Sequence, residues 1–100
     1  MRRAAKVDRN QAEIVKALRQ IPGVSVLPLH RVGQGCPDIL VGVWSPPKRT
    51  NLLMEIKDGD QPWSGRKLTH DEDEFYRGWH GQYAIVESID DALRLVKAAR

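Results

Sequence analysis

The chain has 100 residues, 41% of them hydrophobic, which is enough for one small domain with a modest core. Lys and Arg number 16 and Asp and Glu 13, so the net charge of +3 only mildly favours an anionic partner. The one cysteine, Cys36, excludes an internal disulfide and suits a reducing compartment. Neither a membrane-length apolar run nor a signal-peptide pattern is present. We therefore expect a soluble, cytoplasmic single domain over residues 1–100, with a flexible basic N-terminus over residues 1–7 and no membrane partner.

The first helix is predicted over residues 10–20. Asn10 and Glu13 stand three positions apart and match a capping box. Apolar residues then follow the i, i+3, i+4, i+7 spacing of one buried stripe: Ile14, Ala17, Leu18 and Ile21. Pro22 and Gly23 end the helix.

Three strands are predicted next. Residues 24–29 alternate in polarity, and Pro28, which cannot donate to a ladder, either places this strand at an edge of the sheet or marks a bulge. Residues 38–43 and 51–57 form two strands on either side of a break over residues 44–50. On the strand over residues 51–57, one face is apolar and carries Leu52, Met54 and Ile56. The other face changes from apolar to charged along Leu53, Glu55 and Lys57. That change indicates a strand running out of the core into a cleft.

A polar loop over residues 58–67 leads to a second helix over residues 69–79. Thr69 and Glu72 match a capping box at its start. Two aromatic residues four positions apart are expected to share the buried side of this helix: Phe75 and Trp79.

A fourth strand is predicted over residues 83–87, followed by a helix that Ser88 and Asp91 would cap. The inward side of this last helix is apolar: Ile89, Ala92, Leu93 and Val96. The order of elements is αβββαβα. The βαβ unit requires parallel strands, and the short connections among the first three strands favour antiparallel pairing. We therefore predict an α/β fold with a mixed four-stranded sheet flanked by helices.

The most informative residues are Asp38 and Glu55. A hairpin centred on Pro46 and Pro47 pairs positions whose numbers sum to 93, so Asp38 would lie directly opposite Glu55 on one face of the sheet. Two carboxylates 4 Å apart repel by ~4 kcal/mol at an effective dielectric constant near 20. A structural protein gains nothing from this repulsion, whereas a site that binds a hard divalent cation through oxygen ligands does.

This pattern resembles the PD-(D/E)XK nuclease superfamily. Pro37-Asp38 and Glu55-Ile56-Lys57 match its signature, and the order αβββαβα matches its restriction-endonuclease-like core along nearly the whole chain. Within the superfamily the chain is most similar to the small virus-type replication-repair nucleases and the Holliday junction resolvases. The supporting segments are residues 68–75, 83–86 and 89–92. The resemblance implies a phage-like enzyme of DNA replication or repair.

The resemblance also implies roles for individual residues. Asp38, Glu55 and the backbone carbonyl of Ile56 would hold Mg²⁺, with Mn²⁺ as a substitute. Lys57 would place the attacking water or stabilise developing charge. The family often supplies a further carboxylate from the first helix, and here that residue is Glu13.

Each of these residues has a structural alternative. Asp38 can cap the start of a strand, and Glu55 with Lys57 can form an exposed ion pair worth only ~0–1 kcal/mol. The capping box explains Glu13 as well as metal binding does. The chain departs from the family at Glu72, where a Gln often stands.

Four residues are predicted to contact nucleic acid: Arg31, Gln34, Arg66 and Lys67. The first two lie on the connection that leads to Asp38, and the other two lie in the polar loop after the third strand. Solvation is the alternative for every one of them. Trp63, in the same polar loop, would either stack on an unpaired base or cover the edge of the core.

These features predict a Mg²⁺-dependent endonuclease that hydrolyses phosphodiester bonds in DNA. A chain of 100 residues leaves no room for a separate sequence-reading domain, so we expect selectivity for junctions, flaps or branched DNA. A symmetric junction needs two cuts, which favours a homodimer. One alternative is a non-catalytic module that binds nucleic acid or an assembly partner. Another is a structural protein whose acidic pair is incidental.

Overall fold

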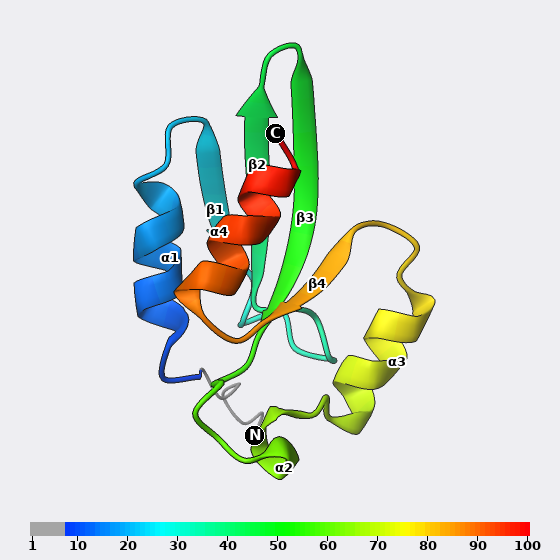
Figure 1. Cartoon of the computed structure of the whole chain (residues 1–100). Coiled ribbons are helices and arrows are strands. Elements are labelled where there is room, and N and C mark those ends of the chain that lie inside the picture. Colours follow the sequence, from blue (N-terminus) through cyan, green and yellow to red (C-terminus); the bar gives the residue numbers. More distant parts are fainter. Residues whose placement is uncertain (1–7) are drawn as a thin grey trace.

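One mixed β-sheet forms the centre of the computed structural model, which describes residues 8–100 (Figure 1). The strands are β1 (Val24–Pro28), β2 (Ile39–Ser45), β3 (Lys48–Ile56) and β4 (Tyr83–Val86). The helices of the described part are α1 (Gln11–Arg19), α2 (Trp63–Arg66), α3 (His70–Gly78) and α4 (Ile89–Ala98). The flexible basic N-terminus expected over residues 1–7 lies outside the described residues.

The strands lie in the order β1-β2-β3-β4. β1, β2 and β3 pair antiparallel, and β3 and β4 pair parallel, as the βαβ unit requires. β1 is an edge strand, which is one of the two alternatives that Pro28 allows. The predicted α/β class, with a mixed four-stranded sheet flanked by helices, is confirmed.

The β2–β3 hairpin has the predicted register, since Ile39 pairs with Met54 and these numbers sum to 93. Pairing continues to Ser45 and Lys48, so the break expected over residues 44–50 is wrong. The two strands instead run up to a two-residue turn. Both turn residues are prolines. Proline has no backbone N–H to donate, and a residue in the turn does not have to donate one to the ladder.

α1 and α4 cover the same face of the sheet and close the hydrophobic core against it (Figure 1). Fully or almost fully buried side chains from both helices and from β2, β3 and β4 make up this core: Ile14, Leu18, Ile39, Val41, Val43, Leu52, Met54, Ile56, Val86, Ala92 and Val96. Burying an aliphatic side chain of this size contributes ~1.5–3 kcal/mol. The apolar stripes predicted on the first and last helices therefore face the core.

The capping box predicted for Asn10 and Glu13 is wrong. Asn10 is the residue before α1, but its side chain makes no cap hydrogen bond. The Asn10 Nδ2 instead donates to the backbone oxygens of Lys57 at 3.1 Å and Glu87 at 3.2 Å. These bonds tie the start of α1 to the ends of β3 and β4. They also give the two carbonyl oxygens the hydrogen-bond partners that buried backbone groups need.

α3 begins with the predicted capping box. Thr69 Oγ1 accepts from the Glu72 backbone N at 3.3 Å, and Glu72 Oε1 accepts from the Thr69 backbone N at 2.8 Å. Phe75 and Trp79 stack with their ring centroids 5.4 Å apart, but Trp79 is 47% exposed and no residue of α3 is buried. The shared burial expected for these two rings is therefore wrong.

α4 begins as predicted, with Ser88 Oγ accepting from the Asp91 backbone N at 3.1 Å. The polar loop expected over residues 58–67 contains one short helix, α2. In the part of the chain that the structure describes, no helix is long and apolar enough to cross a membrane.

Candidate active site

Asp38 and Glu55, named here the acidic pair, meet at the end of the β2–β3 ladder. Asp38 directly precedes β2, so it lies one position beyond the pair of Ile39 with Met54 and opposite Glu55. Both side chains are buried, with exposed fractions of 9% for Asp38 and 2% for Glu55. Asp38 Oδ2 accepts a hydrogen bond from the Ile56 backbone N at 2.6 Å, which holds its carboxylate against β3.

Burial and their mutual contact shift the pKa values of both carboxyl groups of the acidic pair. Burial is the largest cause of the raised pKa of Glu55, and Asp38 adds to it, which brings that pKa to about 10. Burial also raises the pKa of Asp38, although Glu55 and the N–H of Ile56 both favour its charged form. The pair therefore retains a proton at neutral pH unless a cation takes its place.

A hard divalent cation fits this arrangement. Glu55 Oε1 is buried and has no hydrogen-bond partner among residues 8–100. The N–H of Ile56 points to Asp38, and in a β-strand the carbonyl of the same residue points to the same side. Two carboxylates and one carbonyl are the oxygen ligands that Mg²⁺ and Mn²⁺ prefer. The structure thus brings together the three residues expected to hold the ion.

Lys57 lies directly after β3, two positions beyond Glu55 and on the same face of the sheet. Its Nζ forms an ion pair with Glu72 Oε1 at 2.7 Å, and the two side chains are 8% and 20% exposed. Burial lowers the pKa of Lys57, but the nearby carboxylates, with Glu72 first among them, together outweigh burial and leave that pKa raised. Lys57 is therefore charged at neutral pH, and the alternative of an exposed Glu55–Lys57 pair is wrong.

Glu72 is a site residue that the sequence marked only as part of a capping box and whose role in the site it left open. Its Oε1 accepts from both Lys57 Nζ and the Thr69 backbone N, so it joins the start of α3 to the end of β3. Burial opposes ionisation of Glu72, but Lys57 and Thr69 outweigh burial and lower its pKa. The capping box placed Glu72 in the first turn of a helix, but nothing in that local pattern showed which strand the turn would face.

The loop before β2 packs against the first turn of α3. Gly35 has a φ of 78°, and a Cβ at this position would lie 2.1 Å from the backbone oxygen of Asp71, so only glycine fits there. Cys36 follows, and the pKa of its thiol is raised by burial first and then by Glu55 and Asp38. Cys36 therefore lies near the acidic pair.

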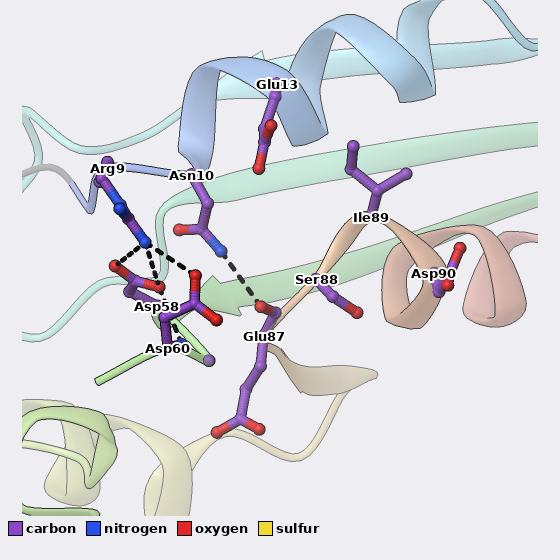
Figure 2. Close-up of a pocket in the computed structure, with 10 residues that line it drawn as sticks. Arg9, Asn10, Glu13, Asp58, Asp60, Glu87, Ser88, Ile89 and Asp90 are labelled. Carbon is purple, nitrogen blue, oxygen red and sulfur yellow. Dashed lines mark hydrogen bonds and ion pairs between the residues drawn. The ribbon is translucent and has the colours of Figure 1, made fainter. Parts of the chain in front are cut away.

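Glu13 lies in a different pocket (Figure 2). This cavity of about 700 Å³ is formed by the starts of α1 and α4 and the loop after β3. Its lining includes Glu13, Arg9, Asp58 and Asp60 but neither member of the acidic pair. Among the groups found in residues 8–100 whose ligand atoms all lie within 4.8 Å of one another, none combines Glu13 with Asp38 and Glu55. The structure therefore does not bring Glu13 to the expected metal site.

The residues predicted to contact nucleic acid differ in their surroundings. Arg31 and Gln34 are exposed on the loop before β2, and Lys67 is exposed after α2. Arg66 is half-buried, and its Nη1 pairs with Glu87 Oε2 at 3.1 Å. Arg66 is thus held by the protein, whereas the other three side chains extend into solvent.

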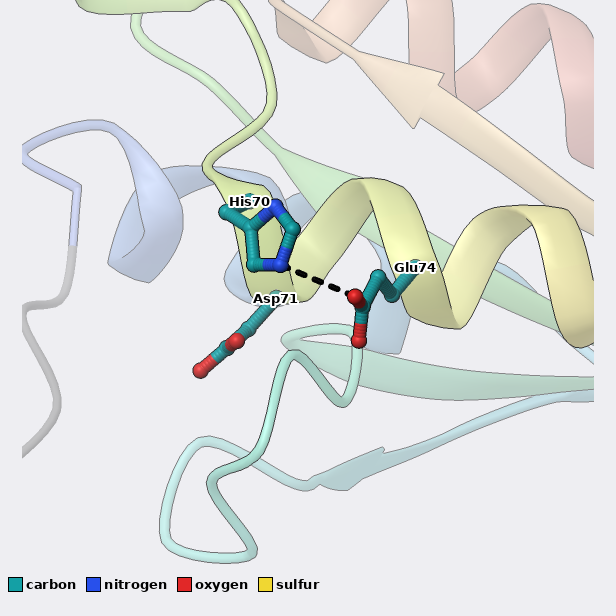
Figure 3. A group of neighbouring side chains, drawn as sticks. All are labelled: His70, Asp71 and Glu74. Carbon is teal, nitrogen blue, oxygen red and sulfur yellow. Dashed lines mark ion pairs between the residues drawn. The ribbon is translucent and has the colours of Figure 1, made fainter.

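A second group with metal-ligand chemistry lies on the surface of α3 (Figure 3). His70, Asp71 and Glu74 each place one ligand atom within 4.8 Å of the others, and all three are exposed. His70 Nε2 lies 2.8 Å from Glu74 Oε1. Exposed pairs of this kind contribute little and are satisfied by water. The buried acidic pair is therefore the stronger candidate for a metal site.

Comparison with known proteins gives no match to a family model, to a curated protein or to a solved structure. The features of this chain that bear on function are therefore the acidic pair and its neighbours.

Proposed function

We propose that the protein is a divalent-metal-dependent endonuclease that hydrolyses phosphodiester bonds in DNA. The observation that carries this proposal is the acidic pair, in which two buried carboxyl groups meet and one oxygen of Glu55 has no partner among residues 8–100. The proposed fold is the restriction-endonuclease-like core. The element order and the parallel pairing of β3 with β4 support it.

Asp38, Glu55 and the Ile56 carbonyl would hold Mg²⁺. When bound there, Mg²⁺ supplies a Lewis acid that lowers the pKa of water and stabilises negative charge on the phosphate. The protein contributes a preset ligand, because the N–H of Ile56 already orients the Asp38 carboxylate.

Lys57 contributes a fixed positive charge. An ammonium group has three N–H donors, and Glu72 accepts from one of them at 2.7 Å. The other donors can bind water or a phosphate oxygen. A preoriented cation stabilises the charge that develops during phosphate hydrolysis without reorganising at that moment. Glu72 would act as a positioning residue for Lys57.

The direct test is cleavage of DNA by the purified protein in Mg²⁺ or Mn²⁺. Asp38→Asn should reduce cleavage to background, because it removes a charged ligand. Glu13→Gln is the matched control, since it also removes one carboxylate but from the separate pocket, and it should keep its activity. Equal cleavage by the wild type and Asp38→Asn would overturn the proposal.

The proposed substrate is structured DNA such as a junction, a flap or a branched end, and the proposed active form is a homodimer. A symmetric junction needs two cuts, which supports an active form with two copies of the site, one in each subunit. Sedimentation of the protein on a junction should show two copies. A monomer on the same DNA would contradict the junction-cutting form.

A further inference from the structure

We infer that Trp63 is a stacking platform for an unpaired nucleobase, so that the protein prefers DNA with a single-stranded segment beside the cut. This inference rests on the proposed function for its place in catalysis. The contact itself is a binding contact, however, and it can be measured without cleavage.

The ring of Trp63 is presented to solvent. Trp63 is 67% exposed, which is the largest fraction among the exposed large hydrophobic residues that the structure describes. No residue of α2 is buried, so the alternative in which Trp63 covers the edge of the core is wrong. An exposed indole offers a large apolar face that gains free energy when a flat ligand covers it.

Several contacts hold this ring in place. The Lys67 backbone N donates to the Trp63 oxygen at 3.0 Å and closes the turn of α2. Arg66 Cζ lies 5.9 Å from the centroid of the Trp63 ring, within the range of a cation–π contact. Arg66 is fixed in turn by Glu87 Oε2 at 3.1 Å and by the backbone oxygen of Gln61 at 2.8 Å. With the guanidinium beside it, Trp63 is still largely exposed and therefore open to a base.

The same contacts attach Trp63 to the end of the sheet that carries the site. Glu87 directly follows β4, and the preceding residue, Val86, accepts a hydrogen bond from the Lys57 backbone N at 2.9 Å. Because Arg66 joins α2 to Glu87, Trp63 is connected through this short chain of contacts to the strand end that bears Lys57. A base stacked on Trp63 would therefore belong to DNA that also reaches the acidic pair.

The chemistry of an indole beside a guanidinium selects an unpaired base over a duplex. Paired bases show only their edges in the grooves, whereas an unpaired base exposes a face that stacks on an aromatic ring. Arg66 adds a cation–π contribution, and the neighbouring exposed Lys67 suits a flanking phosphate.

The chain contains a matched control in a second Trp–Arg pair. Trp44 is 54% exposed, and Arg49 Cζ lies 5.5 Å from the centroid of its ring. This pair stands near the β2–β3 turn, and Trp44 is six positions along the strand from Asp38, about 20 Å at the rise of an extended strand. Trp44 thus has the same chemistry and similar exposure but lies away from the site.

The experiment is fluorescence anisotropy of labelled DNA with the full chain in EDTA, so that no cleavage intervenes. Two ligands are compared: a duplex with a single-stranded extension and a blunt duplex of equal length. Trp63→Ala should weaken binding of the extended DNA by about tenfold and leave binding of the blunt duplex unchanged. Trp44→Ala should change neither, and Trp63→Phe should lie between the wild type and Trp63→Ala.

An abasic nucleotide placed along the extension provides a second readout. At one position it should weaken binding of the wild type about as much as Trp63→Ala does, and it should add no further loss to that variant. Equal effects of Trp63→Ala and Trp44→Ala, or no effect of either, would overturn the inference. A change in sedimentation with unchanged DNA affinity would show that Trp63 contacts a second copy, which also overturns it.

The two proposals fail in different ways. Absence of cleavage with Trp63-dependent binding intact would refute the nuclease and keep the platform. Cleavage that is lost in Asp38→Asn, with no dependence of binding on Trp63, would refute only the platform.

Discussion

Glu55 connects charge, stability and metal binding in one side chain. It is 2% exposed, and burial followed by the neighbouring Asp38 raises its pKa to about 10. In the metal-free protein Glu55 is therefore protonated at neutral pH. The folded state holds that proton more tightly than the unfolded chain, in which the carboxyl group titrates near 4.5.

In EDTA, the free energy of unfolding should fall as the pH rises from about 4.5 toward 10. A folded pKa above the unfolded value means that the folded state binds more protons in this range, so stability is lost as the pH increases. Glu55→Gln replaces the protonated carboxyl with a neutral group of the same shape and should therefore make the free energy of unfolding less dependent on pH. Glu55 contributes up to ~1.4 kcal/mol per pH unit to this dependence. Urea denaturation of both proteins between about pH 5 and 9 measures the effect. Equal slopes would contradict it.

The ion pair of Lys57 with Glu72 should contribute more to stability than the exposed pairs on the same helix. Glu72→Ala would leave the buried ammonium of Lys57 without this partner and remove half of the capping box, at a cost of about 2–3 kcal/mol. Glu74→Ala is the control, because Glu74 is exposed and pairs with exposed His70, and its cost should stay below about 0.5 kcal/mol. Unfolding free energies from urea denaturation compare the two. Equal losses would contradict the buried role of Glu72.

At the scale of elements, the start of α1 shows a cap residue whose side chain serves tertiary structure. Asn10 is 8% exposed, and its amide bridges the backbone oxygens of Lys57 and Glu87, which belong to the ends of two parallel strands. α3 and α4 instead begin with true side-chain caps at Thr69 and Ser88. The same residue pattern thus marks a helix start in each case but performs two different tasks.

Asn10→Ser should destabilise the protein by about 1–3 kcal/mol. Serine caps a helix as well as asparagine does, but its hydroxyl is too short to replace two amide donors, so buried carbonyls would lose their partners. Ser88→Asn at α4 is the control and should change stability by less than about 0.5 kcal/mol, because the cap hydrogen bond can be kept. Thermal unfolding of both variants tests this. A neutral Asn10→Ser would mean that Asn10 acts as an ordinary cap.

At the scale of the whole molecule, the proposed metal site lies where β2 and β3 meet the start of α3. Asp38 directly precedes β2, Glu55 is the residue before the last one of β3, and Glu72 pairs with Lys57 from α3. An ion bound to the folded protein alone stabilises all of these contacts together by mass action. The site and the global stability are therefore linked.

Mg²⁺ or Mn²⁺ should raise the melting temperature of the wild type. At 100 times the dissociation constant the gain is ~2.7 kcal/mol, which corresponds to a shift of roughly 10 °C or more for a domain of this size. Asp38→Asn should lose this response. Asp71→Asn should keep it, because Asp71 belongs to the exposed group on α3. Calorimetric scans with and without the ion measure the shift, and loss of the response in Asp71→Asn alone would move the metal site to the surface of α3.

Local patterns of residues predict some features of this chain and not others, for identifiable physical reasons. Helix starts at Thr69 and Ser88 followed from residues three positions apart, which interact in any isolated helix turn. β2 and β3 extend further than their polarity pattern predicts, because the two prolines form the turn itself and not part of a longer break. The exposure of Trp79 was missed, since a helical spacing shows which residues share a side but not whether another element covers it.

The order of residues alone places Asp38 opposite Glu55, because side chains alternate along a strand and a central turn sets the register of the whole hairpin. The folded arrangement is what brings Glu72 to Lys57, Asn10 to two strand ends and Glu13 into another pocket. Those contacts join segments far apart in the chain. Their geometry depends on how helices dock on the sheet, and the local pattern of residues does not contain that information.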